Sequence, residues 1–114
     1  MTALSEIGEV LRLLGVSRNL SGHRLTAAAV LLTIEKPERL LSVTKELYPA
    51  VAVQYDCSWQ CVERAIRSAA ARAWLRNPQY LTQLARYPLS GAPTSSEFVD
   101  ILASYFLRSE IQSQ

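Results

Sequence analysis

Apolar residues recur at helical spacing along most of the chain. A first helix is predicted over residues 4–14, because one stripe of that segment is apolar: Leu4, Ile7, Val10, Leu11 and Leu14. Gly15 is expected to end this helix. Further helices are expected at about 22–35, 37–47, 49–55, 58–75, 79–86 and 95–108. No alternating strand pattern longer than a few residues occurs. The predicted fold class is therefore all-α, with about six helices around one core.

Proline and capping residues predict where these helices begin and end. Pro37 suits the first position of the third helix, whereas the Tyr48–Pro49 step is expected to break it, since proline disfavours helical geometry in the preceding residue. Residues 87–93 contain two prolines and a glycine and are expected to form a loop. Thr94 and Glu97 are spaced as in a capping box at the start of the last helix. The second helix is predicted to bury one face, formed by Leu25, Ala28, Ala29 and Leu32.

Composition is typical of a compact globular protein. The 114 residues are 49% hydrophobic and 19% charged, which suits a single domain spanning residues 1–114. No apolar run approaches the roughly 18 to 20 residues of a membrane span, and no secretory signal is visible, so a cytoplasmic protein without a membrane partner is expected. Two cysteines, spaced C-x-x-x-C, and one histidine are too few for a disulfide framework or a four-ligand zinc site. No metal or other cofactor is expected.

The segment at about 49–75 has the layout of a helix-turn-helix, whose second helix enters the DNA major groove. A short helix runs into the polar turn Asp56–Cys57, and Ser58 is a suitable N-cap for the longer helix that follows. Positive charge is concentrated nearby. Residues 58–86 carry five arginines against one glutamate, whereas residues 1–57 sum to zero and residues 87–114 to −2. This distribution favours nucleic acid as the partner, and a solvated basic helix face is the alternative.

The longer helix separates into two sides at about 100° per residue. Its apolar side carries Val62, Ala65, Ile66, Ala69 and Ala73, and the opposite side is predicted to carry Gln60, Glu63, Arg64 and Arg67. Arginine can form a bidentate bond to guanine, glutamate can accept from cytosine, and glutamine can bond adenine. The four residues lie in the first half of the helix, where recognition helices usually contact bases. We interpret them as a base-reading set.

Five further residues complete the candidate DNA-contacting set. Thr44 and Lys45 precede the turn and suit a phosphate contact, although surface solubility explains them equally well. Arg72 lies off the reading face, with a side chain long enough to reach a phosphate. Ser58 and Trp59 open the recognition helix, and Trp59 can stack on DNA, contact a partner or cover the turn. The chain has no glycine-rich phosphate loop, Ser/His/Asp set or close carboxylate pair, so no catalytic residues and no enzyme activity are expected.

Four segments follow one another in the order and at the approximate spacing found in a known protein family: LSVTKELYP (41–49), VERAIR (62–67), AW (73–74) and PTSSEF (93–98). Together with Gly15-Val16 and Gly22, they make the chain resemble the C-terminal effector domain of the sporulation-initiation response regulator of endospore-forming Firmicutes. The similarity extends from about Ile7 to Leu107.

The resemblance implies an all-helical domain of about six helices with one helix-turn-helix. It implies sequence-specific binding to short promoter boxes in double-stranded DNA, often as paired copies such as a homodimer, and control of transcription through RNA polymerase. Such a protein would be associated with the nucleoid. By the same resemblance, Glu63, Arg64 and Arg67 match the family's base- and backbone-contacting positions, and Thr44 and Lys45 match the segment ahead of the turn.

Some positions depart from the family pattern. Cys61 stands where the family usually has a basic residue, Ser68 stands where it tends to have histidine, and residues 57–60 replace small polar turn residues. The family's receiver domain is absent, so the chain is expected to be either an excised domain or a freestanding protein. The alternative function is that of a receiver-less interaction module, which binds a full-length regulator or RNA polymerase instead of reading DNA.

Overall fold

A computed structural model describes residues 2–112, with side chains up to residue 110. This part of the chain forms six α-helices and no strand, which confirms the predicted all-α class. The helices are α1 (Leu4–Leu13), α2 (Ser21–Glu35), α3 (Tyr48–Tyr55), α4 (Trp59–Arg76), α5 (Pro78–Ala85) and α6 (Ser95–Gln112). Within the described residues, none of these helices has the length and apolar character needed to cross a membrane.

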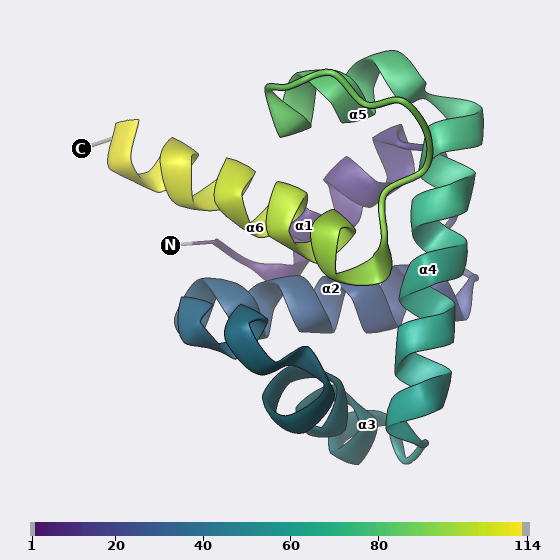
Figure 1. Ribbon diagram of the computed structural model, residues 1–114, viewed down its shortest axis with the longest axis vertical. Coiled ribbons are helices and arrows are strands. Elements are labelled where there is room, and N and C mark those ends of the chain that lie inside the picture. The colour runs from purple at the N-terminus through teal and green to yellow at the C-terminus, as the bar shows by residue number, and fades with distance from the viewer. Residues whose placement is uncertain (1, 113–114) are drawn as a thin grey trace.

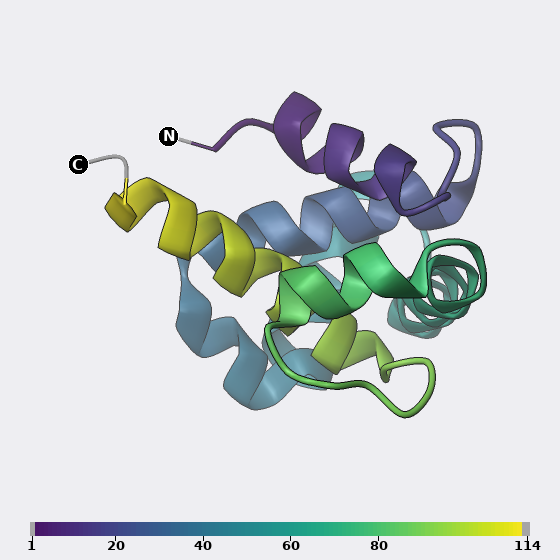
Figure 2. The ribbon, with the colours of Figure 1, turned by 90° about the horizontal axis from the view of Figure 1, so that it is seen from above.

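Helix α2 is the central element. It packs against α1, α3, α4 and α6, and in Figure 2 it runs beneath α1 and beside α6. Because it has neighbours on several sides, α2 is buried well beyond the single face predicted for it; Thr26, Ala27, Val30 and Thr33 are buried as well. Leu32, predicted to be in the core, is only half-buried. A helix that is surrounded by others shows a weaker amphipathic pattern than a surface helix.

The segment between α2 and α3 differs from the regular helix predicted at 37–47. It consists of a 3₁₀ segment, η1 (Pro37–Ser42), followed by a π-helical turn, η2 (Val43–Leu47). The predicted break at Tyr48–Pro49 is wrong, because Tyr48 is helical (φ −63°, ψ −42°) and begins α3. Its side chain is only 1% exposed, and its hydroxyl is bonded to Ser95. Tertiary packing therefore overrides the local preference of a residue before proline.

Close packing of α2 on α4 depends on small residues. A Cβ atom added to Gly22 would lie 3.0 Å from the Ala65 carbonyl oxygen and 3.2 Å from the Ala69 methyl. Both distances are at or below normal van der Waals contact, so even a methyl group would push the helices apart. This contact fixes how far α4 stands from the core.

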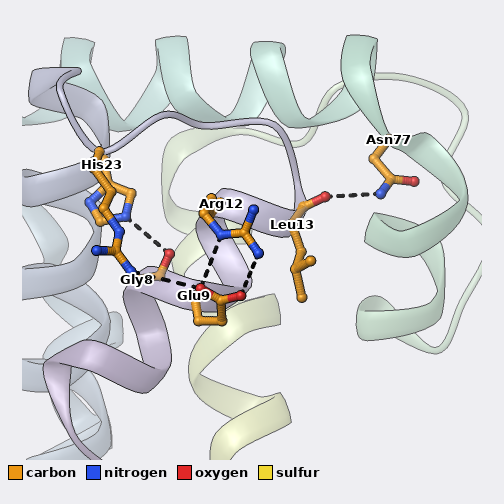
Figure 3. A network of polar contacts seen from close by, with 7 residues as sticks. Gly8, Glu9, Arg12, Leu13, His23 and Asn77 are labelled. Carbon is orange, nitrogen blue, oxygen red and sulfur yellow. Dashed lines mark hydrogen bonds and ion pairs between the residues drawn. The ribbon is translucent and has the colours of Figure 1, made fainter.

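The C-terminal end of α1 is tied to the far end of α4. Gly15 has φ +94°, and its missing side chain leaves room for Arg76, whose Cβ would lie 2.5 Å from an added methyl. The Asn77 side chain donates a hydrogen bond of 3.0 Å to the Leu13 carbonyl (Figure 3). Figure 3 also shows His23 bonded to the Gly8 carbonyl at 3.0 Å, which joins α2 to α1; His23 is therefore not a free surface histidine.

The last helix begins where it was predicted and extends to Gln112, four residues past the predicted end. Thr94 caps it, since its hydroxyl accepts from the Glu97 N–H at 3.2 Å. The reciprocal half of the predicted capping box is not used. The Glu97 carboxylate instead accepts from the Tyr87 hydroxyl at 2.8 Å, which holds the α5–α6 loop against α6.

Replacement of Gly15 tests the contact between α1 and α4. Gly15→Ala is expected to lower the free energy of unfolding by about 2–4 kcal/mol, because alanine is strained at positive φ and its methyl would overlap Arg76. Gly91→Ala is the matched control, since a methyl there meets no atom within 4 Å. Urea unfolding of both variants measures the difference; equal stability would contradict the proposed tight contact.

Candidate nucleic-acid interface

The turn between α3 and α4 is built by backbone and cap bonds. Asp56 ends α3 in the left-handed conformation (φ 52°, ψ 53°), which aspartate tolerates better than most residues. The Cys57 N–H then reaches back to the Ala52 carbonyl at 3.0 Å. Ser58 caps α4, because its hydroxyl accepts from the Cys61 N–H at 3.1 Å, as the sequence predicted. Together these bonds form the predicted helix-turn-helix, which spans residues 48–76.

One side of α4 is free of other elements. Val62, Ile66, Ala69, Ala70 and Ala73 are buried against the core. Gln60, Arg64, Arg67, Ser68 and Ala71 lie on the opposite side and are exposed. In Figure 1, α4 lies at the right-hand side of the molecule, with α3 and α6 to its left, and α2 crosses behind it. An exposed helix at the edge of a domain can enter a groove about 12 Å wide without displacing its neighbours.

Arg64 and Arg67 both project from this outward side, but their surroundings differ. Among the described residues, Arg64 has no ion pair or side-chain hydrogen bond. The Arg67 guanidinium lies 3.6 Å from a Glu63 carboxylate oxygen, and its side chain is 62% exposed. An ion pair of such exposure contributes little to stability and can be exchanged for another partner. Both arginines are therefore available to a ligand.

Glu63 lies away from the outward side to which the sequence pattern assigned it. At about 100° per residue it is a quarter-turn from the centre of that side, and its side chain is 27% exposed. One carboxylate oxygen accepts a 3.0 Å bond from the Ser95 hydroxyl, and the other faces Arg67. Glu63 therefore connects α4 to the start of α6.

The Ser95 bond is part of a longer chain. Because Ser95 donates its single hydroxyl proton to Glu63, it accepts from the Tyr48 hydroxyl at 2.8 Å. Burial raises the pKa of the Tyr48 phenol; the Ser95 bond opposes this increase and the Glu63 charge adds to it. Tyr48 is therefore a neutral donor at physiological pH. The chain links α3, α6 and α4, and it holds both helices of the helix-turn-helix to α6.

Of the remaining candidates, Arg72 shares a groove with Arg64 on one flank of α4, whereas Thr44 and Lys45 lie on a different element. The Arg72 Nε donates to the Gly15 carbonyl at 2.9 Å, so part of this side chain holds the α1–α2 connection. Thr44 and Lys45 are exposed on η2, which packs against η1, α2 and α3. Trp59 is 38% exposed and lines a shallow groove with Val53 of α3.

The sequence alone gives no sign of the tertiary partners of Glu63 and Arg72. In the sequence, Ser95 lies between the two residues of the predicted capping box, and Tyr48 lies before a proline at the predicted helix break. A serine and a tyrosine 47 positions apart give no signal of contact in one sequence. Gly15 was predicted to end a helix, and that interpretation is confirmed, but its bond to Arg72 depends on tertiary packing.

Both cysteines lie near the turn and are free thiols. Burial raises the pKa of the Cys57 thiol, and the adjacent Cys61 thiol adds to the increase. A thiol with a raised pKa is protonated at neutral pH and is a poor nucleophile. Among the described residues, no three His, Cys, Asp or Glu side chains are grouped so that they could hold a metal ion.

A helix-turn-helix whose second helix presents arginines at the edge of an all-helical fold defines the class of helical DNA-binding domains. Residues 7–106 match the family described as "Sporulation initiation factor Spo0A C terminal", and the chain belongs to that family. Its members are DNA-binding domains of sporulation-initiation regulators, which are transcription factors and not enzymes.

The hydrogen-bond chain predicts an unequal response to two substitutions. Ser95→Ala leaves the buried Tyr48 hydroxyl without its partner and is expected to lower the free energy of unfolding by about 1–3 kcal/mol. Tyr48→Phe removes only the terminal donor and leaves the Ser95–Glu63 bond intact. It should therefore lower the free energy of unfolding by about 0.5–1.5 kcal/mol. Chemical denaturation measures both values. A larger loss for Tyr48→Phe would argue against the assigned direction of the bonds.

Proposed function

We propose that the chain binds short promoter boxes in double-stranded DNA through the outward side of α4. The observation that carries this proposal is the pair of exposed arginines, Arg64 and Arg67, on the free side of a helix-turn-helix second helix. Arginine is the side chain best suited to bidentate contact with guanine O6 and N7. The buried opposite side of α4 keeps the helix rigid while it occupies the groove.

Gln60, Glu63 and the two arginines have different roles in this proposal. Arg64 and Gln60, which have no competing side-chain partner among the described residues, contact base edges. The Glu63 carboxylate accepts a hydrogen bond from Ser95 and orients the Arg67 guanidinium. In the complex, the Glu63 carboxylate also accepts a hydrogen bond from a cytosine amino group in the major groove. Ser58, Trp59, Thr44, Lys45 and Arg72 contribute contacts to the sugar-phosphate backbone.

Membership in the family supports a regulatory setting for this DNA binding. We propose that residues 1–114 act as a single effector domain in the cytoplasm, at the nucleoid, and that paired copies occupy paired boxes. Contact with RNA polymerase would convert DNA binding into control of transcription.

An alternative is that the domain binds another protein through the same region. Val53 is 83% exposed and Leu75 is 77% exposed, and both lie on the two helices of the helix-turn-helix. Exposed aliphatic side chains favour a protein partner over a phosphate backbone. In this case the partner is a full-length regulator or RNA polymerase. A gel shift with family-type boxes, set beside a pull-down of these two proteins, separates the alternatives.

Replacement of Arg64 tests the proposed DNA contact. Arg64→Ala is expected to weaken binding to the box recovered from a random DNA pool by about 1–3 kcal/mol, and to relax specificity at one base position. Fluorescence anisotropy with the selected and permuted duplexes measures both effects. Lys36→Ala is the control, because it also removes one exposed positive charge but lies at the end of α2 remote from α4. Equal affinities of the two variants would refute the role of Arg64.

A further inference from the structure

A groove of about 400 Å³ lies along α4, on the flank opposite Glu63 and Ser95. It is formed by the α1–α2 connection, the first turn of α2 and α4. Val16 and Leu20 contribute an apolar floor, and Ser21, Arg64, Ser68 and Arg72 contribute a polar rim. The described residues place no carboxylate in its lining.

The rim carries two positive charges that the described residues do not neutralise. Neither Arg64 nor Arg72 forms an ion pair with a described carboxylate, whereas Arg67 is paired with Glu63 on the other flank. The Arg72 Nε is held by the Gly15 carbonyl at 2.9 Å, which fixes the guanidinium at the rim and leaves its terminal nitrogens available. The groove is therefore built to receive an anion.

The position of the groove identifies that anion. A helix with its side chains is about 10–12 Å across, and the major groove is about 12 Å wide. If α4 enters the major groove, its two flanks therefore lie beside the two phosphate backbones. Arg64 belongs both to the outward side of α4 and to the rim of the groove, so the two surfaces are continuous.

We propose that this groove seats a phosphate of the DNA backbone next to the box that α4 reads. The Ser21 and Ser68 hydroxyls and the Arg72 guanidinium donate to the phosphate, and the deoxyribose rests on the apolar floor. Arg64, at the boundary with the outward side of α4, adds positive charge to the rim while its guanidinium contacts a base. Such a contact supplies affinity and sets the register of α4, but carries no base specificity. The inference rests on the proposed DNA-binding function, and it extends the DNA contact from α4 to Ser21 of α2 and the α1–α2 connection, outside the helix-turn-helix.

Charge substitutions at Ser21 test the phosphate seat in the full chain. Ser21→Glu places a negative charge on the rim. It is expected to weaken binding to selected and random duplexes by a similar factor, roughly tenfold at low salt, and to reduce the slope of log affinity against log salt by about one. Ser21→Lys is expected to strengthen binding to both duplexes. Ser21 is the first residue of α2, where an acidic side chain stabilises a helix, so the affinity loss should occur without a loss of thermal stability.

Ser5→Glu is the matched control. It places the same charge in the first turn of α1, at the opposite end of that helix from the Gly15 connection that is bonded to α4. Affinities of Ser21→Glu and Ser5→Glu that agree within about twofold would overturn the phosphate seat and leave the DNA-binding function intact. Equal weakening by Ser21→Glu and Ser21→Lys would overturn it as well, because the effect would then be steric. Failure of the unmodified chain to bind any duplex would refute the proposed DNA-binding function.

Discussion

The packing of Gly22 against Ala65 and Ala69 determines where the recognition helix stands. An added methyl at Gly22 would come within 3.0 Å of the backbone of α4, so the two helices are about as close as their main chains allow. Because interiors are packed at crystal-like density, a larger residue at this contact would displace α4 as a rigid rod. The alanine-rich side of α4 is thus as important for function as its outward side: it fixes the position from which Arg64 projects.

Two polar attachments then restrain the flanks of α4. On one flank, the Tyr48–Ser95–Glu63 chain connects it to α3 and α6; on the other, Arg72 is bonded to the Gly15 carbonyl. Every hydroxyl in the buried chain has a partner, which is the condition under which a buried polar network favours a single arrangement. The helix-turn-helix is consequently held from both sides. Side chains on the outward side can adapt to DNA while the backbone of α4 stays in place.

The same attachments explain why the charged residues of α4 are not equivalent. Among the described residues, Arg64 has no ion-pair partner, whereas Arg67 is paired with Glu63. The Arg72 Nε donates to the backbone of the α1–α2 connection. Positive charge is therefore greatest on the flank toward α2 and is reduced on the flank toward α6. An asymmetric charge distribution of this kind orients a DNA duplex relative to the helix before any base is read, since long-range attraction guides the encounter.

The sequence by itself determined the all-helical class, the helix-turn-helix, the Ser58 cap and the outward position of Gln60, Arg64 and Arg67. These follow from periodicity and from interactions within a few residues, which a single sequence contains. Only the tertiary structure decided the irregular η1–η2 segment, the helical start of α3 at Tyr48 and the contact of the Glu63 carboxylate with Ser95. For Tyr48 and Glu63, the deciding partner is Ser95, which is distant from both in the sequence. Such partners become neighbours only when the helices pack, so no local pattern could have revealed them.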